Sequence, residues 1–349
     1  MTMPNQGHAT ALQAFAMSAI SNAREKFNNI QESALTRIQL GNRSYVFAES
    51  KEFLTASVQH CCALQVTQTN SLPTDFKIYT DYSGWHTQFA KQSNLIGNLS
   101  HRQIEMALSN IGLHAIFNPD TYSWDILDIK NRFGVRLQTS TADTPVWEKT
   151  SPLAFFNKWI ASADDKCMIH AGSLAHGHTG ALIVGQGGAG KSGLVIGALK
   201  NGLHSAGDDY VALSNKSPYQ AHAIYRTVKQ DISGLNRLGL PTNLPLNWQK
   251  KAVFRPEQLF EQRINDCVPI NVILMPRLGG VSTSFRRIDP TIIFKILTFS
   301  TLNQVCGDYK EIFQTCGELT RQLPCYEMVQ SSDNNEITAK LIEFLSQFK

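Results

Sequence analysis

The chain has 349 residues, of which 42% are hydrophobic and 17% charged, so a sizeable packed core is expected and long disorder is not. The net charge of +4 is small for this length and no dense basic run occurs, which argues against a nucleic-acid-binding protein. No stretch approaches 18 continuous apolar residues, and seven scattered cysteines do not form a disulfide framework. These features predict a cytoplasmic α/β protein with reduced thiols that does not span a membrane.

Residues 1–143 carry short, uneven signals that predict a small α+β module. A helix is expected at 11–21 (ALQAFAMSAIS), where the lack of a preceding basic segment argues against a signal peptide. A second helix is expected from Ser100, as its N-cap, to Gly112. The module shows no motif for chemistry. Its expected strands are LTRIQL, RSYVFA, FKIYT, WDILDI and GVRLQT.

Residues 144–349 are expected to form a second, larger α/β domain. It begins with a linker and a docking helix at 153–160. Two strand-like pieces then flank a His/Gly turn in MIHAGSLAHGHTGALIVG, and a helix is expected at 191–200. The α/β pattern continues through AHAIYRTVK, NVILMPRL, GGVSTSFRRI, the helical PTIIFKILTF and an amphipathic terminal helix at 333–349.

The segment GQGGAGKS, residues 185–192, matches G-x-x-x-x-G-K-[ST], the pattern of a phosphate-binding loop. Its four glycines permit backbone conformations and a close approach that a Cβ would prevent, so the loop N–H groups can form an anion-binding nest. A buried-strand pattern precedes the loop and a helix follows it, as the motif requires. The pattern predicts a nucleoside triphosphate site, in which Lys191 bridges the β- and γ-phosphates and Ser192 ligates Mg²⁺. The alternative is an ordinary glycine-rich turn. The predicted nucleotide-contacting residues are Gly185, Gly187, Gly188, Ala189, Gly190, Lys191, Ser192 and Gly193.

Two adjacent aspartates, Asp208 and Asp209, follow Lys191 by 17 and 18 residues. The chain between reads as a helix, a break and a short strand at 203–207 (LHSAG), which predicts both carboxylates at the carboxyl end of that strand, facing the nucleotide. One carboxylate can hold Mg²⁺ opposite Ser192, and the other can accept a proton from an attacking hydroxyl. The alternative is an Asp-Asp turn on the surface.

Three histidines lie near these motifs. His170, 15 residues before Gly185, is expected near the end of a strand, where a lone histidine is usually structural. His176 and His178 have a spacing that suits a metal ion, but no third ligand is indicated, so we expect them to be loop residues.

The order and spacing of His170, the loop at 185–192, Gly202 and Asp208-Asp209 resemble the catalytic domain of the HPr kinase/phosphorylase family. The resemblance is closer to a divergent branch, the HPr-kinase-related serine kinases, which includes kinases associated with lasso-peptide biosynthesis. It covers residues 144–349 and rests also on the segments TPVWEKTSPLAFFNKWI, MIHAGSLA, GLHSAGDDYVAL, AIYRTVK, ILMPRL, Ser300-Thr301-Leu302 and LPCYEM.

The resemblance implies an α/β chain with a phosphoenolpyruvate-carboxykinase-like P-loop kinase domain at 144–349 and a smaller N-terminal α+β module at 1–143, which could recognise substrate. It implies an ATP- and Mg²⁺-dependent kinase that phosphorylates a hydroxyl, with a serine of a peptide or protein as the expected acceptor. No nucleic-acid or membrane partner is expected, and the oligomers of the resembled family leave a homo-oligomer open. The implied roles are Ser192 and Asp208 on Mg²⁺, Asp209 as the base, His170 assisting it, and Lys229 and Arg277 as phosphate or substrate contacts.

Two departures from the family bear on the reaction. Gly193 stands where HPr kinases usually have a glutamate, and the later glycine-rich acidic segment linked to dephosphorylation is missing. We therefore expect a one-way kinase with an acceptor other than HPr. The alternatives are a small-molecule kinase acting on a metabolite or sugar, a nucleotide-binding switch, and carboxykinase chemistry by analogy of fold. The identity of the acceptor and of the nucleoside triphosphate stays open.

Overall fold

The computed structural model describes residues 6–40, 43–62, 75–86, 99–305 and 309–348. The chain divides into two compact units, Met1–Ala163 and Asp164–Lys349, each with a hydrophobic core of its own. The division follows Ala163 rather than residue 143, because helix α5 (Ala154–Ser162) packs on strands of the first unit. The expected docking helix at 153–160 is thus present, but it belongs to the N-terminal unit.

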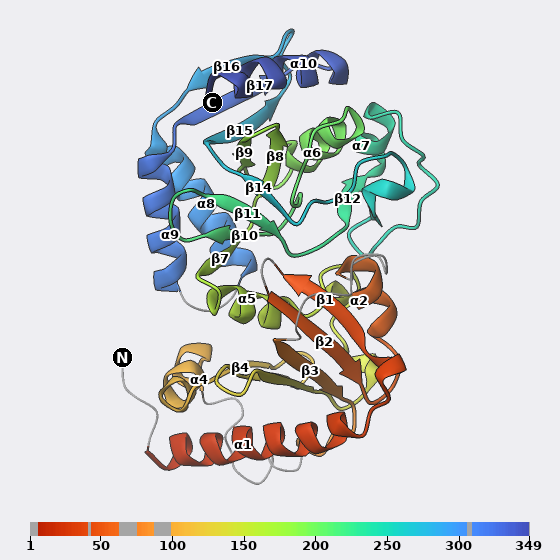
Figure 1. The fold of residues 1–349 in the computed structure, drawn as a ribbon, viewed down its shortest axis with the longest axis vertical. Helices are drawn as coiled ribbons and strands as arrows, with labels where there is room; N and C mark the ends of the chain where they lie inside the picture. The colour runs from red at the N-terminus through yellow and green to blue at the C-terminus, as the bar shows by residue number, and fades with distance from the viewer. Residues whose placement is uncertain (1–5, 41–42, 63–74, 87–98, 306–308, 349) are drawn as a thin grey trace. The chain divides into compact units, whose positions relative to one another are not determined.

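A six-stranded mixed sheet forms the middle of the first unit (Figure 1). Helices α1 (Gln6–Asn28) and α4 (His101–Leu108) cover one face, and α2 (Thr55–Cys61) and α5 lie on the other. The predicted α+β character of this region and the helix near its N-terminus are confirmed. The strand order is β1 (Thr36–Leu40), β2 (Arg43–Glu49), β3 (Phe76–Asp81), β6 (Phe133–Leu137), β5 (Ser123–Asp128) and β4 (Leu113–Asn118).

Strand β6 packs against helices on both faces of this sheet, since successive side chains of a strand point to opposite sides. Phe133, Val135 and Leu137 lie in the core under α1. Gly134 faces the other way, where a Cβ would lie 2.7 Å from the ring of Phe156 on α5, so the close approach of this helix needs a glycine.

Helix α4 begins and ends where the sequence predicts. The hydroxyl of Ser100 accepts from the backbone N–H of Gln103, and the Gln103 side chain accepts from the backbone N–H of Ser100, forming a capping box. A short 3₁₀ turn then ends at Gly112, whose φ of 76° closes the helix in the left-handed region. The expected helix between Ser100 and Gly112 is confirmed.

The second unit contains two larger sheets and a ribbon. An antiparallel sheet has the order β14 (Cys267–Pro269), β11 (Gln220–Ala223), β10 (Val211–Ser214) and β7 (Lys166–Ile169). A two-stranded antiparallel ribbon pairs β12 (Val228–Asp231) with β13 (Lys251–Phe254). A mixed sheet has the order β16 (Ser284–Arg287), β17 (Cys325–Gln330), β15 (Val272–Leu278), β9 (Thr179–Ile183) and β8 (Gly172–His176), with β15 parallel to both of its neighbours.

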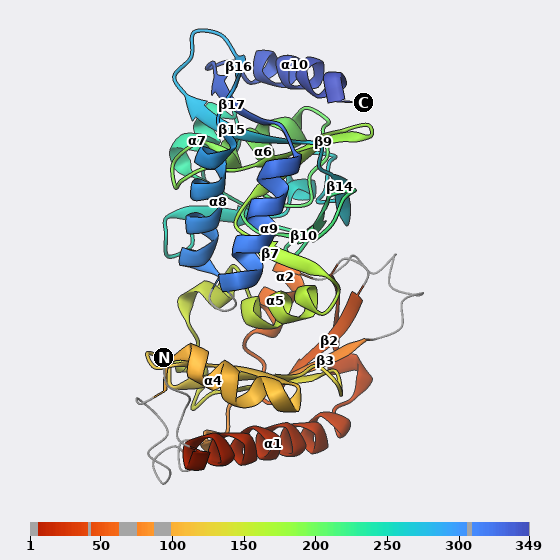
Figure 2. The ribbon, with the colours of Figure 1, turned by 90° about the vertical axis from the view of Figure 1, so that its left-hand side faces the viewer.

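Helices pack around these sheets (Figure 2). Helix α6 (Lys191–Lys200) coincides with the predicted helix at 191–200, and α7 (Ile232–Arg237) packs beside it. Helices α8 (Pro290–Gln304) and α9 (Tyr309–Gln322) pack against each other, and α10 (Asn334–Leu345) packs on α6. The predicted helices at 290–299 and near the C-terminus are confirmed.

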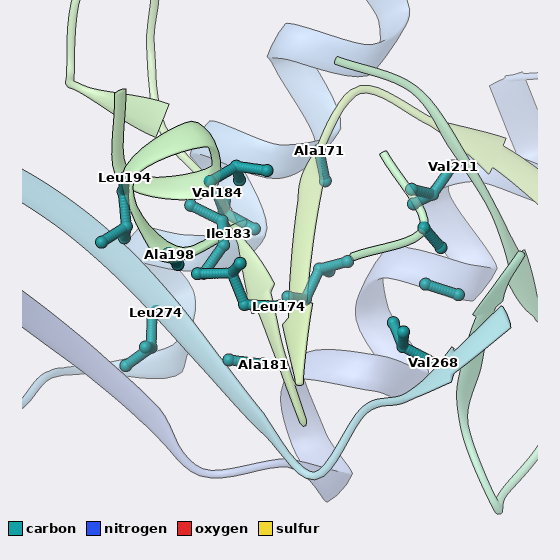
Figure 3. Close-up of a cluster of buried hydrophobic side chains, with 14 of the residues drawn as sticks. Ala171, Leu174, Ala181, Ile183, Val184, Leu194, Ala198, Val211, Val268 and Leu274 are labelled. Atoms are coloured by element: carbon teal, nitrogen blue, oxygen red, sulfur yellow. The ribbon is translucent and has the colours of Figure 1, made fainter. Parts of the chain in front are cut away.

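Part of the core of the second unit lies between α6 and the strands that precede it. In Figure 3, Leu194 and Ala198 of α6 lie beside Ile183 of β9 and Leu174 of β8, and all four are essentially inaccessible to solvent. Helix α6 is apolar around most of its circumference, as expected for a helix packed on several sides. The helix that carries the phosphate-loop lysine is therefore held rigidly.

The expected strand at 203–207 (LHSAG) is wrong. Only His204 forms a β-bridge, with Ala175. Beyond this bridge the pairing with β8 is irregular. The Gly207 carbonyl accepts from the Ser173 N–H, but the Ser205 hydroxyl also bonds the N–H and the carbonyl of Gly207, and the N–H of Ala206 donates to the Ser173 hydroxyl. Asp208 and Asp209 consequently lie in the loop before β10, not at the carboxyl end of a strand.

No helix of the described residues is long and apolar enough to cross a bilayer. The six described cysteines form no disulfide with one another, and all but Cys267 are buried.

Candidate nucleotide and catalytic site

The phosphate loop, residues 185–192, joins β9 to α6 in the strand–loop–helix arrangement that its sequence predicts. All five residues of β9 are buried, since the strand lies between β15 and β8. Gly190 has a φ of 93° and caps the helix, which begins at Lys191. The free N–H groups of the first turn and the helix dipole give this end of α6 a positive potential. The loop thus has the backbone form of an anion-binding site.

The glycines of the loop have different roles. Gly188 and Gly190 have φ values of 81° and 93°, which side chains rarely adopt. A Cβ on Gly185 would lie 3.0 Å from that of Ala189, so Gly185 allows the loop to close on itself. Gly187 has neither constraint, because no atom lies within 4 Å of its Cβ position. The protein itself therefore imposes no constraint on a side chain at residue 187.

Lys191, the first residue of α6, has a buried side chain that folds back against the preceding loop. Its Nζ donates to the carbonyls of Gly185, at 2.6 Å, and Gln186, at 3.3 Å. Burial lowers the pKa of Lys191, and the nearby carboxylates of Asp209 and Asp208 oppose this shift. The ammonium group is therefore held by weak carbonyl partners, which an anion in the loop could replace.

Asp208 is buried beside the end of the phosphate loop. Its Oδ2 accepts from the backbone N–H of Lys229 at 3.1 Å, and its carboxyl group bonds the Ser192 side chain. The chain approaches β8 so closely here that a Cβ on Gly172 would lie 3.3 Å from the Asp208 carbonyl. Burial and the neighbouring Asp209 raise the pKa of Asp208 to about 6. Its negative charge is poorly compensated, so a cation bound here would be stabilised.

Asp209 has the opposite electrostatic setting. The Nζ of Lys229 donates to its Oδ2 at 2.9 Å, and Nδ1 of His170 lies 3.5 Å from its Oδ1. Burial alone would raise the pKa of Asp209, but Lys229, His170 and Lys251 together hold it below its ordinary value. The Asp209 side chain is 26% exposed. It is thus an ionised, accessible carboxylate next to a buried one.

His170 is neutral at physiological pH, because burial lowers its pKa to about 4 even though Asp209 favours the charged form. Its backbone N–H donates to the Thr301 hydroxyl on α8, and Gln304 Nε2 lies 3.4 Å from its Nε2. With the Gln304 amide nitrogen as donor, Nε2 accepts and Nδ1 carries the proton that faces Asp209. The sequence expectation that His170 lies close to Asp209 agrees with this geometry.

Two residues at this site were not foreseen from the sequence. Tyr210 packs edge-to-face on the His170 ring, at 5.5 Å between centroids, and its hydroxyl donates to Gln304 Oε1 at 2.8 Å. This bond orients the Gln304 amide toward His170. Tyr210 directly follows the aspartate pair, and this position could have pointed to it. Gln304 lies 134 residues from His170, and no motif around it indicates a role at this site.

The ribbon β12–β13 carries the cations of the site. Val228 and Gln230 of β12 are buried, whereas Lys229 faces Asp209. Lys251 stands opposite Asp231 in the register, so it shares a ribbon face with Lys229. Lys229, expected only as a phosphate or substrate contact, thus pairs with Asp209, and Lys251 joins the site through the register of the ribbon.

Arg277 is not brought to this cluster. It lies near the end of β15, its side chain is 64% exposed, and its Nε lies 3.7 Å from Glu327 Oε1 on β17. Arg286 of β16 pairs with the same carboxylate, at 3.0 Å. These contacts place Arg277 near the carboxyl end of β15, the central strand of its sheet.

His176 ends β8, and the glycine of the following turn has a φ of 60°. His176 and His178 are exposed residues of this hairpin, as expected. The described parts of the chain contain no group of three or more His, Cys, Asp or Glu residues placed to hold a metal ion. Any cation at Asp208 would therefore depend on a hydroxyl and other oxygens as ligands.

Comparison with known proteins adds little to this geometry. No family model matches the chain, and no curated protein matches it. Among solved structures, the Hpr(Ser) kinase/phosphatase from Coxiella burnetii matches at 13% identity over 52% of this chain and 93% of the other, with a TM-score of 0.28. We base no functional argument on a similarity of this size. What the structure itself establishes is a mixed α/β chain with a strand–loop–helix beside one buried aspartate, Asp208, and one partly exposed aspartate, Asp209.

Proposed function

We propose that the protein is a kinase of the phosphoenolpyruvate-carboxykinase-like P-loop class that transfers the γ-phosphate of ATP to a hydroxyl, with Mg²⁺ as cofactor. The observation that carries the proposal is the juxtaposition of Ser192, at the end of the phosphate loop, with Asp208, and of Asp209 with His170 and Lys229. A nucleotide-binding switch has no need of a partly exposed, ionised carboxylate next to its proposed metal ligand.

The phosphate loop supplies the nucleotide end of the proposed site. Its left-handed glycines and the first turn of α6 direct N–H groups toward one point, and Lys191 adds a positive charge. A triphosphate bound there would exchange the carbonyl partners of Lys191 for charged oxygens, which are stronger acceptors.

The residues present suit Mg²⁺. Asp208 and the Ser192 hydroxyl are hard oxygen ligands within hydrogen-bonding contact of each other, and the raised pKa of Asp208 reflects a carboxylate without adequate compensation. A bound Mg²⁺ would neutralise phosphate charge and favour the ionised form of both aspartates.

Asp209 is the proposed base. The acceptor oxygen forms a bond to the γ-phosphorus, the bond from that phosphorus to the bridging oxygen of ADP breaks, and the hydroxyl proton passes to Asp209. Because Lys229 keeps the pKa of Asp209 low, the carboxylate first orients the hydroxyl as a hydrogen-bond acceptor and takes the proton late in the transfer. Neutral His170 lies beside the other carboxylate oxygen, with its Nδ1 3.5 Å from Oδ1.

The acceptor that we propose is a serine hydroxyl of a peptide or protein, which follows from the sequence resemblance to HPr-kinase-related serine kinases. Residues 1–163 form a separate compact unit without nucleotide-site residues and are the proposed recognition module. A small hydroxylated metabolite is the alternative acceptor.

The test is transfer of label from γ-labelled ATP, with Mg²⁺, into a size-fractionated bacterial extract. Wild type is compared with Lys191→Ala, Asp209→Asn and, as a control, Lys200→Ala at the opposite end of α6. Label in peptides or proteins with wild type and Lys200→Ala, but with neither site variant, would support the serine kinase. Label in the small-molecule fraction would indicate a metabolite instead of a peptide or protein as the acceptor. Equal label transfer by Asp209→Asn and wild type would overturn the proposal that the protein is a kinase.

A further inference from the structure

One face of α6 has no side chains over its first two turns. Gly193 and Gly197 are four residues apart and therefore lie on the same face of the helix. A Cβ on Gly193 would lie 3.1 Å from Nη2 of Arg237 and 3.3 Å from Nε2 of Gln230. A Cβ on Gly197 would lie 3.1 Å from Leu238. The two glycines thus make room for the end of α7 alongside α6 (Figures 1 and 2).

The neighbours of the two glycines differ in chemistry. Gly197 faces an apolar side chain, as in ordinary helix packing, whereas Gly193 faces two groups that can only donate hydrogen bonds. Gly193 is in the first turn of α6, next to Ser192. The missing side chain at residue 193 therefore opens the phosphate end of the helix to Arg237.

Arg237 is an exposed cation beside the first turn of α6. Its guanidinium lies against the positive end of α6, close to the helix that begins with Lys191. Within the described part of the chain, no carboxylate pairs with this guanidinium, whereas Lys229, Arg226 and Arg136 of the same chain all have such partners. The Arg237 backbone is fixed, since its carbonyl accepts from Asn334 at 2.9 Å.

We propose that Arg237 is a phosphate-binding residue of the nucleotide site, and that it contacts the phosphate nearest the nucleoside. The inference rests on the proposed ATP site. The phosphate loop and Lys191 serve the terminal phosphates, while Arg237 stands over Gly193, farther along the helix. An exposed guanidinium can form a forked, charge-assisted bond to a phosphate there.

The experiment measures binding of Mg-ADP and of a Mg-bound, non-hydrolysable ATP analogue by calorimetry to the full chain. Arg237→Ala should weaken both nucleotides by roughly tenfold, as for the loss of a charge-assisted hydrogen bond, and Arg237→Lys should recover part of the affinity. Arg321→Ala is the matched control, since Arg321 occupies the last turn of α9 as Arg237 does that of α7. It should bind as wild type does.

Substitutions at the two glycines provide a second test, in which the charge of Arg237 is retained. Gly193→Ala displaces the guanidinium and should weaken nucleotide binding by roughly threefold, although alanine is the better helix former. Gly197→Ala meets an apolar neighbour on the same face and should leave the affinity unchanged.

The outcomes separate the two proposals. If Lys191→Ala loses nucleotide and Arg237→Ala binds as tightly as wild type, the role of Arg237 is overturned and the nucleotide site stands. A loss confined to the ATP analogue would overturn the assignment to the phosphate shared with ADP. If wild type binds neither nucleotide, both the proposed function and this inference fail.

Discussion

The two adjacent aspartates differ because of their surroundings, although they are chemically identical. Asp208 is 2% exposed and bonds a backbone N–H and a hydroxyl, so burial dominates and its pKa rises. Asp209 is partly exposed and pairs with Lys229, so its pKa falls. Two carboxylates with pKa values driven apart are a frequent sign of a division of roles.

Asp208 should reduce the stability of the folded state at neutral pH. Its folded pKa of about 6 lies above the ordinary value of 3.8, so the folded state binds more protons between these values and stability falls as pH rises through them. The Asp208→Asn variant lacks this term. The difference in melting temperature between this variant and wild type should therefore increase from pH 4 to pH 7. The corresponding change in the difference of unfolding free energy is on the order of 1–3 kcal/mol.

Using the difference between variant and wild type removes the contribution of His170. The lowered pKa of His170 makes stability rise with pH between about 4 and 6.5, but it does so in both proteins. Asp120→Asn, at an exposed position, is the control and should show no trend with pH. A difference that stays constant between pH 4 and pH 7 would contradict a raised pKa at Asp208.

At the scale of elements, the hairpin β8–β9 positions the phosphate loop, and Gly180 is its tightest point. A Cβ at Gly180 would lie 1.9 Å from the carbonyl of Pro269 and 2.8 Å from that of Leu174, both backbone atoms. The Gly180 N–H also donates to the Asn271 side chain at 3.0 Å. The strand before the loop is therefore held from both sides.

Gly180→Ala should cost more than about 3 kcal/mol of unfolding free energy, since rigid backbone must move to admit the methyl group. Urea denaturation of the purified protein measures this loss. Gly187→Ala in the phosphate loop is the matched control, because its Cβ enters open space, and its stability should equal that of wild type. Equal stability of both variants would show that the hairpin can relax.

At the scale of the whole molecule, every residue of the proposed site lies after Asp164, in a unit with its own core. We expect residues 164–349, expressed alone, to unfold cooperatively and to bind Mg-ATP within about threefold of the affinity of the full chain. Calorimetric titration of both proteins is the measurement. Aggregation of the fragment, or loss of binding that the full chain retains, would show that residues 1–163 are needed for the site.

Much of the molecule follows from local patterns in its sequence. The strand–loop–helix around 185–200 is specified by a buried strand, four glycines and an apolar helix, and α4 by a capping box and a terminal glycine. These signals act between residues close in sequence, so the chain needs no distant contact to express them. The phosphate loop, Lys191 and Ser192 could therefore be located from the sequence.

Tertiary structure decided the rest, because it depends on residues far apart in the chain. The bonds of Ser173 and Ser205 turn 203–207 away from strand geometry and set the position of the aspartates. The register of β12 and β13 brings Lys251 beside Lys229, and α8 brings Gln304 to His170. Packing against α5 moves the division between the units to Ala163. The sequence by itself thus determined the strand–loop–helix that carries Lys191 and Ser192, whereas burial and long-range pairing decided how the pKa of each charged group around it is shifted.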